Sequence, residues 1–332
     1  MMKRIAIAGA TGLVGETLLR VLEGSDFAGQ IEELRLFASA RSAGTKVRFR
    51  ERDYEVAEVR VEGFFGVDVA FFCLENELAR QLVPAVAELC PVIDKSSEFR
   101  LAPDVPLVVP EVNPEALQGH RNIIASPNCT TIPLVVALHP LDKEFGLKEV
   151  FLASYQSVSG AGRAGLEQFF YETEFVALRQ EPDSDGSPFG VQVADNVIPQ
   201  IGGLDDEGIS AEEKKTVFET RKILGRPGLV INSTCVRVPV SVGHGLAITC
   251  RFENRVEPKK ARQVLARAPG VRFGDDERVL TPRDCRGRDE VLVSRVRPGA
   301  TEYDLSLWVC ADNLRKGAAT NAVQIARRLF GL

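Results

Sequence analysis

Cys129 is a potentially nucleophilic side chain at a position where cysteine is unusual, the break between a predicted strand and a predicted helix. It follows an apolar run at residues 122–125 and the tripeptide Ser126-Pro127-Asn128, and it precedes the apolar segment TTIPLVVALHPL. This pattern predicts a strand, a tight break and then a helix that starts at Cys129. A helix start offers unpaired N–H groups and the positive end of the helix dipole, which favour a nucleophilic thiolate. The alternative is a buried structural cysteine, the common state of this residue type.

A thiolate nucleophile needs a proton partner, and the chain has 3 histidines. His120 lies in a polar turn, and His139 lies in an apolar helical pattern that suits a core position. His244 is flanked by Gly243 and Gly245 between two apolar runs, and glycines on both sides permit close approach of another molecule. We therefore expect His244 to be the general acid or base; the alternative is an ordinary turn histidine.

Glycines mark a predicted phosphate-binding turn near the N-terminus. Gly9, Gly12 and Gly15 lie between the apolar run RIAIAG and the helical pattern GLVGETLLRVLEG. Their spacing is a relative of the dinucleotide fingerprint G-x-G-x-x-G, in which small residues let the backbone approach a pyrophosphate at a helix N-terminus. The alternative is a tight strand-to-helix turn without a ligand. The residues of this turn expected to contact a cofactor are Gly9, Thr11, Gly12, Leu13, Val14 and Gly15.

The end of the second predicted strand indicates which dinucleotide binds. NAD sites of this type place an acidic residue about 20 residues after the glycines, where it binds the ribose 2′-hydroxyl. This chain has Ser39, Arg41 and Ser42 in the stretch LFASARSAGTK instead. An arginine flanked by hydroxyl groups suits a 2′-phosphate, so NADP(H) is the predicted cofactor; the alternative is a solvated turn.

Together, these features predict an oxidoreductase. The thiolate would attack an aldehyde or an activated acyl group, and hydride would pass between the resulting carbon and a nicotinamide. The 7 cysteines are odd in number, scattered and never in C-x-x-C spacing, so neither a metal site nor a disulfide framework is expected. A reducing cytoplasm is the predicted location.

The elements that must position these residues change character near residue 128. Before it, apolar runs alternate with helical patterns, which implies parallel strands in an open, doubly wound Rossmann-type α/β sheet. The strands are expected at residues 4–9, 33–39, 67–73, 91–97, 107–113 and 122–126, with helices at 12–24 and 76–89.

The rest of the chain predicts an α+β domain with a mixed or antiparallel sheet, one face of it covered by helices. Long strand-like runs at 149–160, 235–253 and 302–313 are separated by helical patterns such as 162–179 and 257–269. The closing helical pattern is expected to fold back on the first domain. We therefore divide the chain into a cofactor domain, residues 1–128 with 312–332, and a catalytic domain, residues 129–311.

The charge and hydropathy of the sequence limit the classes of binding partner that can be expected. A net charge of -5 argues against nonspecific binding to nucleic acid and against attraction to anionic membranes. The N-terminal stretch MMKRIAIAGATGLVG has a short apolar run interrupted by glycines, so it predicts a buried strand and not a signal peptide. No apolar run approaches the ~20 residues that a membrane-spanning helix needs. A small molecule is the expected partner.

Motifs along nearly the whole chain resemble those of the aspartate-semialdehyde dehydrogenase family. The set is specific because the motifs occur together and in order. They are GATGLVG (9–15), ASARSAG (38–44), SSEFR (96–100), PLVVPEVNP (106–114), SPNCTT (126–131), YQSVSGAG (155–162), NVIPQIGGL (196–204), FETRKIL (218–224), CVRVPV with GHG (235–245) and ADNLRKGAATNAVQIA (311–326).

The resemblance implies a reaction and a role for each matching residue. The reaction is reductive dephosphorylation of L-4-aspartyl phosphate by NADPH to L-aspartate 4-semialdehyde, in lysine, threonine and methionine biosynthesis. Cys129 is the nucleophile, Asn128 its neighbour, Gln156 orients the intermediate and His244 is the acid/base. The residues implied to bind the substrate are Arg237 for its carboxylate, Glu219 for its amino group, and Arg100, Ser97 and Lys222 for its phosphate. Ser159, Gly160 and Asn313 are implied to contact the cofactor.

The resemblance also implies a homodimer or a dimer of dimers, with a sheet-based interface in the second domain. Three departures from the family pattern occur. The first, near the nicotinamide end of the expected cofactor, is the stretch CLENELA (73–79), which replaces a serine- and glycine-rich loop and adds the carboxylates of Glu75 and Glu77. The others are Lys95, which replaces an asparagine, and Gly245, where the family commonly has a side chain. The alternatives left open are an N-acetyl-γ-glutamyl-phosphate reductase-like enzyme and a catalytically impaired paralogue with a binding role.

Overall fold

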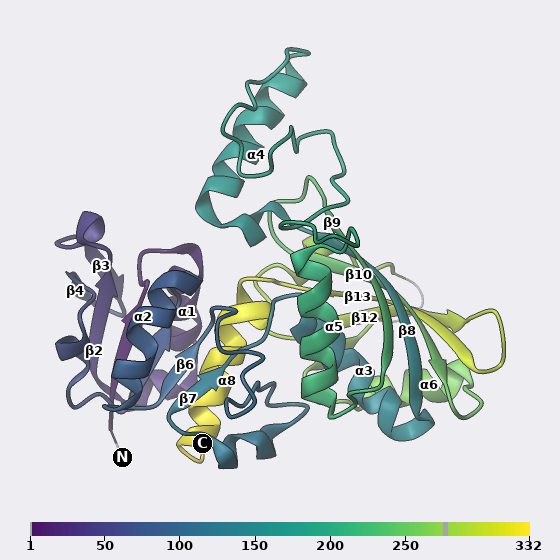
Figure 1. The fold of residues 1–332 in the computed structure, drawn as a ribbon, viewed down its shortest axis with the longest axis horizontal. Helices are drawn as coiled ribbons and strands as arrows, with labels where there is room; N and C mark the ends of the chain where they lie inside the picture. The colour runs from purple at the N-terminus through teal and green to yellow at the C-terminus, as the bar shows by residue number, and fades with distance from the viewer. Residues whose placement is uncertain (1, 275–277) are drawn as a thin grey trace. The chain divides into compact units, whose positions relative to one another are not determined.

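The computed structural model describes residues 2–274 and 278–332. They divide into two compact units. The first unit is Met1–Asn128 with Ala318–Leu332, and the second unit is Cys129–Gly317. Figure 1 shows the ribbon of each unit, coloured by residue number.

The first unit is built on a mostly parallel sheet with strand order β3-β4-β2-β1-β5-β6-β7. Its strands are β1 (Lys3–Ala8), β2 (Ile31–Ala38), β3 (Lys46–Phe49), β4 (Arg52–Glu58), β5 (Val69–Phe72), β6 (Val92–Asp94) and β7 (Ile123–Ala125). Every neighbouring pair is parallel except β3 with β4. This sheet confirms the predicted Rossmann-type architecture.

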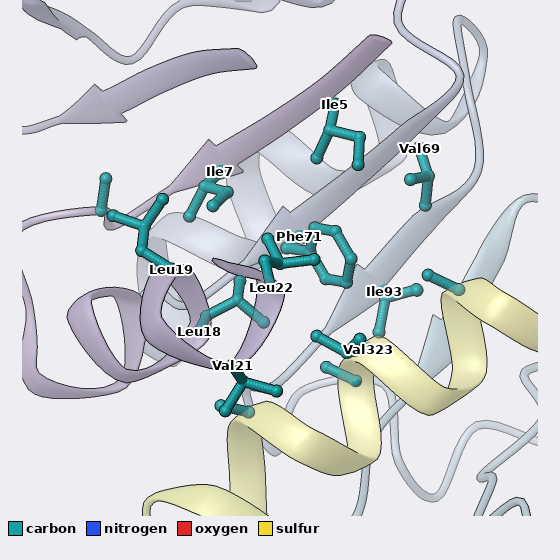
Figure 2. Close-up of a cluster of buried hydrophobic side chains, with 14 of the residues drawn as sticks. Ile5, Ile7, Leu18, Leu19, Val21, Leu22, Val69, Phe71, Ile93 and Val323 are labelled. Carbon is teal, nitrogen blue, oxygen red and sulfur yellow. The ribbon is translucent and has the colours of Figure 1, made fainter. Parts of the chain in front are cut away.

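Helices cover both faces of this sheet because successive strand residues point to opposite sides. Ile5 and Ile7 of β1 pack with Leu18 and Leu22 of α1 (Leu13–Glu23) and with Val323 of α8 (Thr320–Leu329), as Figure 2 shows. The intervening alanines of β1 belong to a second apolar cluster on the opposite face, together with α2 (Asn76–Ala87). The closing helix α8 is thus part of the core of the first unit.

The carboxyl ends of the parallel strands lie along one edge of the sheet. The segments that leave this edge include the glycine turn after β1, the Ser39–Arg41 stretch after β2 and residues 95–100 after β6. In doubly wound sheets this edge is where ligands bind. The fold therefore brings the predicted cofactor motifs, which are far apart in the sequence, to a common edge.

The second unit contains a mixed sheet with strand order β11-β12-β13-β10-β8-β9. Its strands are β8 (Leu147–Gln156), β9 (Val230–Arg237), β10 (His244–Phe252), β11 (Val271–Phe273), β12 (Val291–Pro298) and β13 (Asp304–Ala311). Its helices are α3 (Thr131–Phe145), α4 (Gly162–Ala177), α5 (Ala211–Leu224), α6 (Pro258–Ala266) and α7 (Pro282–Cys285). The central strand β10 runs antiparallel to both β8 and β13, whereas β8 and β9 are parallel.

The two faces of this sheet differ. Helices α3, α5 and α6 pack on one face, as Figure 1 shows and as the contacts of α3 with β8, β10, β12 and β13 confirm. On the other face, side chains such as Phe151, Tyr155 and Val230 are exposed. The mixed sheet with one helix-covered face confirms the predicted α+β architecture.

Several details of the two sheets differ from the prediction, and strands β11 and β12 of the second sheet were not predicted. The expected strand at 107–113 is wrong: it forms a single bridge, Leu107 to Ala125, and then turns. Pro110 interrupts the apolar run and Pro106 directly precedes it, and neither residue can donate a ladder hydrogen bond. The β3–β4 hairpin was not predicted, because its strands are short and largely polar. Within the described parts of the chain, no helix has the length and hydropathy needed to cross a bilayer.

Candidate active site

The predicted nucleophile and its predicted proton partner lie together in the second unit. The predicted helix start at Cys129 is wrong by two residues: α3 begins at Thr131, with Thr130 as its N-cap, so Cys129 lies just before the helix. His244 is the first residue of β10. The Cys129 Sγ atom lies 3.3 Å from His244 Nε2, within hydrogen-bond distance. The two residues are 115 positions apart, so the fold assembles this pair. Glycine is required on both sides of His244. Gly243 has a φ of +101°, which other residues rarely adopt, and a side chain on Gly245 would collide with the Trp308 ring.

The imidazole of His244 is buried, with 1% of the residue exposed. Its Nδ1 accepts a hydrogen bond of 3.0 Å from the main-chain N–H of Ser157, and the Ser157 hydroxyl lies 3.1 Å from the same atom. Burial, and next the charge of Arg237, lower the pKa of His244 from 6.5 to about 3. Both effects favour the neutral imidazole.

Arg237 ends β9 and lies beside this pair. Its Nη1 donates a 2.6 Å hydrogen bond to the carbonyl of Ser157, and its guanidinium stands over the Phe189 ring at 5.7 Å from the ring centre. A Cβ on Gly160 would approach Nη1 to 2.7 Å, so glycine is needed there. Burial lowers the pKa of Arg237, and the neighbouring Cys129 acts in the opposite direction. Arg237 also lines a cavity of about 560 Å³ with residues of the 188–203 segment.

Gln156, at the end of β8, is held by a buried carboxylate. Its Nε2 donates to Glu212 Oε1 at 3.0 Å, and its Oε1 accepts from the Ser154 hydroxyl at 3.0 Å. Glu212 also pairs with Lys215 at 3.3 Å. The two partners fix the orientation of the Gln156 amide, because a flip would place its carbonyl against the carboxylate.

The remaining predicted residues of the second unit are arranged as follows. Asn313 accepts hydrogen bonds from Ser157 Oγ at 3.0 Å and from Gly243 N at 2.9 Å, and it donates to Ser159 Oγ at 2.9 Å. Asn313 and Ser159 thus belong to the network around His244. Glu219 is buried on α5, on the same helix face as Glu212, and Lys222 lies one turn further along.

Three residues that contribute to this geometry were missed by the sequence analysis: Ser157, Glu212 and Gly317. A Cβ on Gly317 would lie 3.0 Å from Cys129 Cβ, so its glycine permits close approach to the nucleophile. Ser157 lies within the motif YQSVSGAG, but its main-chain N–H makes the contact, and no residue type signals that. Glu212 sits in an ordinary charged helix sequence, AEEKK, and only tertiary structure distinguishes it from Glu213.

The predicted phosphate-binding residues Ser97 and Arg100 belong to the first unit. They lie on a loop after β6 that is shaped by Asp94, whose carboxylate accepts from both N and Oγ of Ser96. Burial raises the pKa of Asp94. Ser97 exchanges two hydrogen bonds with Asn76, and Arg100 Nη2 donates to the carbonyl of Lys95 at 2.8 Å. Asn128 is buried at the end of this unit.

The glycine turn has the shape that a dinucleotide cradle requires. Gly9 has a φ of +85°, and a Cβ there would lie 2.4 Å from the carbonyl oxygen of Cys73. A Cβ on Gly15 would lie 2.1 Å from the carbonyl oxygen of Gly9. Gly12 is the N-cap of α1 and provides no side-chain cap, so the first N–H groups of the helix face outward. These observations fit a pyrophosphate at the helix N-terminus.

The predicted 2′-phosphate residues follow β2 directly. Ser39 and Arg41 are exposed on the short 3₁₀ turn Ala40–Ser42, and Ser42 is half-buried. The unusual 73–79 segment becomes the start of α2. Glu77 pairs with Arg80 at 3.3 Å, and Arg80 also pairs with Glu98 at 2.7 Å, so the added carboxylate has a cationic partner. Lys95 donates to Ser126 Oγ at 3.2 Å.

A Rossmann-type unit with a dinucleotide turn, together with a cysteine–histidine pair beside a buried arginine, defines a thiol-dependent aldehyde or acyl oxidoreductase. Comparison with known proteins gives the family. Residues 4–120 match the family "Semialdehyde dehydrogenase, NAD binding domain", and residues 138–316 match "Semialdehyde dehydrogenase, dimerisation domain". The chain belongs to the aspartate-semialdehyde dehydrogenase family.

The individual relatives extend over whole chains. The chain is 43% identical to aspartate-semialdehyde dehydrogenase of Aquifex aeolicus, over 98% of this chain and 97% of that one. A solved structure of aspartate semialdehyde dehydrogenase II of Vibrio cholerae, complexed with ASA, superposes with a TM-score of 0.95 at 41% identity, covering 100% and 99% of the two chains. The Candida albicans enzyme, solved with NADP, gives a TM-score of 0.78 at 26% identity over 99% of each chain. These matches favour the aspartate enzyme over the N-acetyl-γ-glutamyl-phosphate reductase alternative.

Proposed function

We propose that this protein is an NADP(H)-dependent aspartate-semialdehyde dehydrogenase. The reaction is the reductive dephosphorylation of L-4-aspartyl phosphate to L-aspartate 4-semialdehyde, a step toward lysine, threonine and methionine. The single observation that carries the proposal is the 3.3 Å contact between Cys129 Sγ and His244 Nε2 beside the buried Arg237. A nucleophilic sulfur, a proton carrier and a carboxylate-binding group are the parts that this reaction needs.

Cys129 forms and releases the acyl group. Its thiolate attacks the carbonyl carbon of the acyl phosphate, the carbon–oxygen bond to phosphate breaks, and the phosphate leaves with the electron pair and takes up a proton from solvent. A thioester remains on Cys129. When bound, NADPH supplies the hydride that reduces the thioester carbon. The carbon–sulfur bond then breaks, the sulfur keeps its electron pair as the thiolate, and the semialdehyde leaves.

The surrounding side chains bind and orient the substrate. Among the described residues, the guanidinium of Arg237 makes one hydrogen bond, through Nη1, so its other N–H groups can bind the substrate carboxylate. Gln156, fixed by Glu212, orients the acyl group, and Asn128 lies beside the nucleophile. His244 donates from Nε2 to the carbonyl oxygen as charge develops on it. Glu219 holds the substrate amino group.

The phosphate is bound by fixed cations. Arg100 is buried, with 7% of the residue exposed, and its loop is held by Asp94. A guanidinium whose direction is set by the loop suits an anionic oxygen better than a mobile surface arginine. We assign phosphate binding to Arg100, Ser97 and Lys222.

The cofactor is held by the first unit, so that the chain divides into a cofactor domain and a catalytic domain close to residue 128. Arg41, with Ser39 and Ser42, binds the 2′-phosphate. In the second unit, Ser159, Gly160 and Asn313 face the cofactor. The residues of the pyrophosphate turn are Gly9, Thr11, Gly12, Leu13, Val14 and Gly15.

The protein acts as a homodimer, and two dimers can associate further into a tetramer. The uncovered face of the second sheet supports this, because Phe151 and Tyr155 are 44% and 38% exposed on a surface that a second copy would bury. Seven free thiols suit a reducing compartment, so we propose that the enzyme works in the cytoplasm.

The test is phosphate-dependent reduction of NADP with aspartate semialdehyde, for the wild type and for Cys129→Ala. We expect turnover by the wild type and a loss of about 10⁴-fold or more in the variant. Cys90→Ala, which changes a buried cysteine of the first unit, is the control and should retain wild-type turnover. A wild type without turnover would contradict the enzyme proposal and favour the impaired paralogue. Turnover that survives in Cys129→Ala would contradict the role of that residue.

A further inference from the structure

The contacts of His244 indicate where its proton resides. A main-chain N–H group is an obligatory donor. The N–H of Ser157 points at Nδ1 of His244 from 3.0 Å, so this ring nitrogen must offer a lone pair. The Ser157 hydroxyl can donate to Nδ1 or to Asn313 Oδ1, and neither arrangement needs a proton on Nδ1. A neutral imidazole then carries its proton on Nε2, the atom that faces Cys129 Sγ.

Asn313 holds the two segments that create this arrangement. Its Oδ1 accepts from Gly243 N, which directly precedes His244, and from the Ser157 hydroxyl. Its Nδ2 donates to Ser159 Oγ, and the residue is 3% exposed. The amide therefore ties the start of β10 to the 157–159 segment, and it fixes the distance from the Ser157 N–H to the ring.

The charged groups around the ring also disfavour a second proton. Arg237 reaches the Ser157 carbonyl, so a positive charge lies on this side of the histidine. Burial and Arg237 lower the pKa of His244, while the Glu212 carboxylate and the Gly243 carbonyl act in the opposite direction with smaller effect. A doubly protonated ring would also set its Nδ1–H against the N–H of Ser157.

We propose that the Ser157 main-chain N–H and Asn313 hold His244 in the neutral, Nε2-protonated form, with Asn313 as a positioning residue. In the free enzyme the Nε2–H of His244 then points at the Cys129 sulfur and donates a hydrogen bond to it. The Nε2 proton is already in place when negative charge develops on the substrate oxygen.

This inference deepens the proposed function, since it takes Cys129 as the nucleophile. The test is nonetheless independent of turnover: ¹⁵N NMR of the free protein labelled at its 3 histidines, with His244→Gln to assign the ring. We expect a neutral ring with its proton on Nε2 that does not titrate between about pH 5.5 and 8.5. A doubly protonated ring at pH 7, or a proton on Nδ1, would overturn the proposal.

Asn313→Ala tests the positioning role. We expect His244 in this variant to populate both neutral forms or to begin titrating above pH 5.5, and we expect kcat to fall about tenfold. Asn254→Ala, which changes an exposed asparagine of the same unit, should leave the spectrum unchanged. Asn313→Asp, which keeps the oxygen acceptor but adds a negative charge, should keep the proton on Nε2 and raise the pKa of the ring relative to wild type. An unchanged His244 spectrum in folded Asn313→Ala would show that Asn313 does not set the proton position.

Discussion

The two units present their functional groups in opposite ways. The first unit offers exposed main-chain groups and surface side chains at the edge of a parallel sheet, such as the Gly12 N-cap and Arg41. The second unit offers buried side chains, among them His244, Gln156 and Arg237, all at most 6% exposed and joined in hydrogen-bond networks. The difference indicates that one region is built to bind a ligand and the other to control charge and proton position.

The difference has a physical reason. A dinucleotide is large and polar, so many modest contacts with N–H groups and one arginine are sufficient to hold it. Acyl transfer requires a small number of groups at fixed positions with little water around them, since electrostatic effects are stronger there. Changes in the second unit should therefore affect kcat, and changes in the first unit should affect cofactor affinity.

The largest expected effect is on His244. We expect His244→Gln to lower kcat by roughly 10²–10⁴-fold, because a positioned acid/base group contributes that much, with KM for NADPH within twofold of wild type. Steady-state kinetics with both substrates measure this. A kcat within tenfold of wild type, or an effect mainly on NADPH, would break the contrast between the units.

A change at the edge of the first sheet should have the opposite signature. We expect Arg41→Ala to reduce the preference for NADPH over NADH by roughly 10–100-fold, since charge-assisted hydrogen bonds contribute about 1.5–3 kcal/mol. The kcat at saturating cofactor should stay near the wild-type value. Arg48→Ala, an exposed arginine of β3, is the control and should not alter the preference. An unchanged preference in Arg41→Ala would remove the basis for assigning the 2′-phosphate to this turn.

Glu212 tests whether buried support matters as much as direct contact. Glu212→Ala leaves the Gln156 amide without its acceptor, so we expect kcat to fall about tenfold and the free energy of unfolding to fall by about 1–3 kcal/mol. Glu212→Gln keeps an acceptor oxygen and should recover part of both losses. Denaturant titration and kinetics on the same preparations separate the two effects. Full activity in Glu212→Ala would show that Gln156 does not depend on it.

A further expected effect concerns acid stability. The pKa of His244 is lowered from 6.5 to about 3, so below pH 6.5 the unfolded chain binds a proton that the folded chain does not. The free energy of unfolding should therefore decrease as pH falls from about 6.5 toward 3. His244→Gln should show a weaker dependence on pH in this window than wild type and than His120→Gln. Equal slopes in all three proteins would contradict a buried, neutral His244.

The features that could be predicted from the sequence are those formed by residues close together in the chain. The strand–turn–helix at residues 4–24 and its glycines have a local pattern, and so does Arg41 after the second strand. The pairing of Cys129 with His244 was inferred from the chemistry of each residue, although the sequence contains no distance between them. Ser157, Glu212 and Gly317 could not be found, because their roles depend on a main-chain group, a tertiary contact and a close approach. The prediction of a strand at 107–113 was wrong because it relied on the apolar residues and did not take account of Pro110, which cannot donate a ladder hydrogen bond.

The central claim is that Cys129 carries the acyl group. The most direct measurement is mass spectrometry of the protein after acid quench, following incubation with aspartate semialdehyde and NADP without phosphate. We predict a mass increase of one aspartyl group on the peptide that contains Cys129, which disappears when phosphate is added before the quench. Reduction of NADP with no adduct on Cys129, or an adduct on another cysteine, would contradict the account.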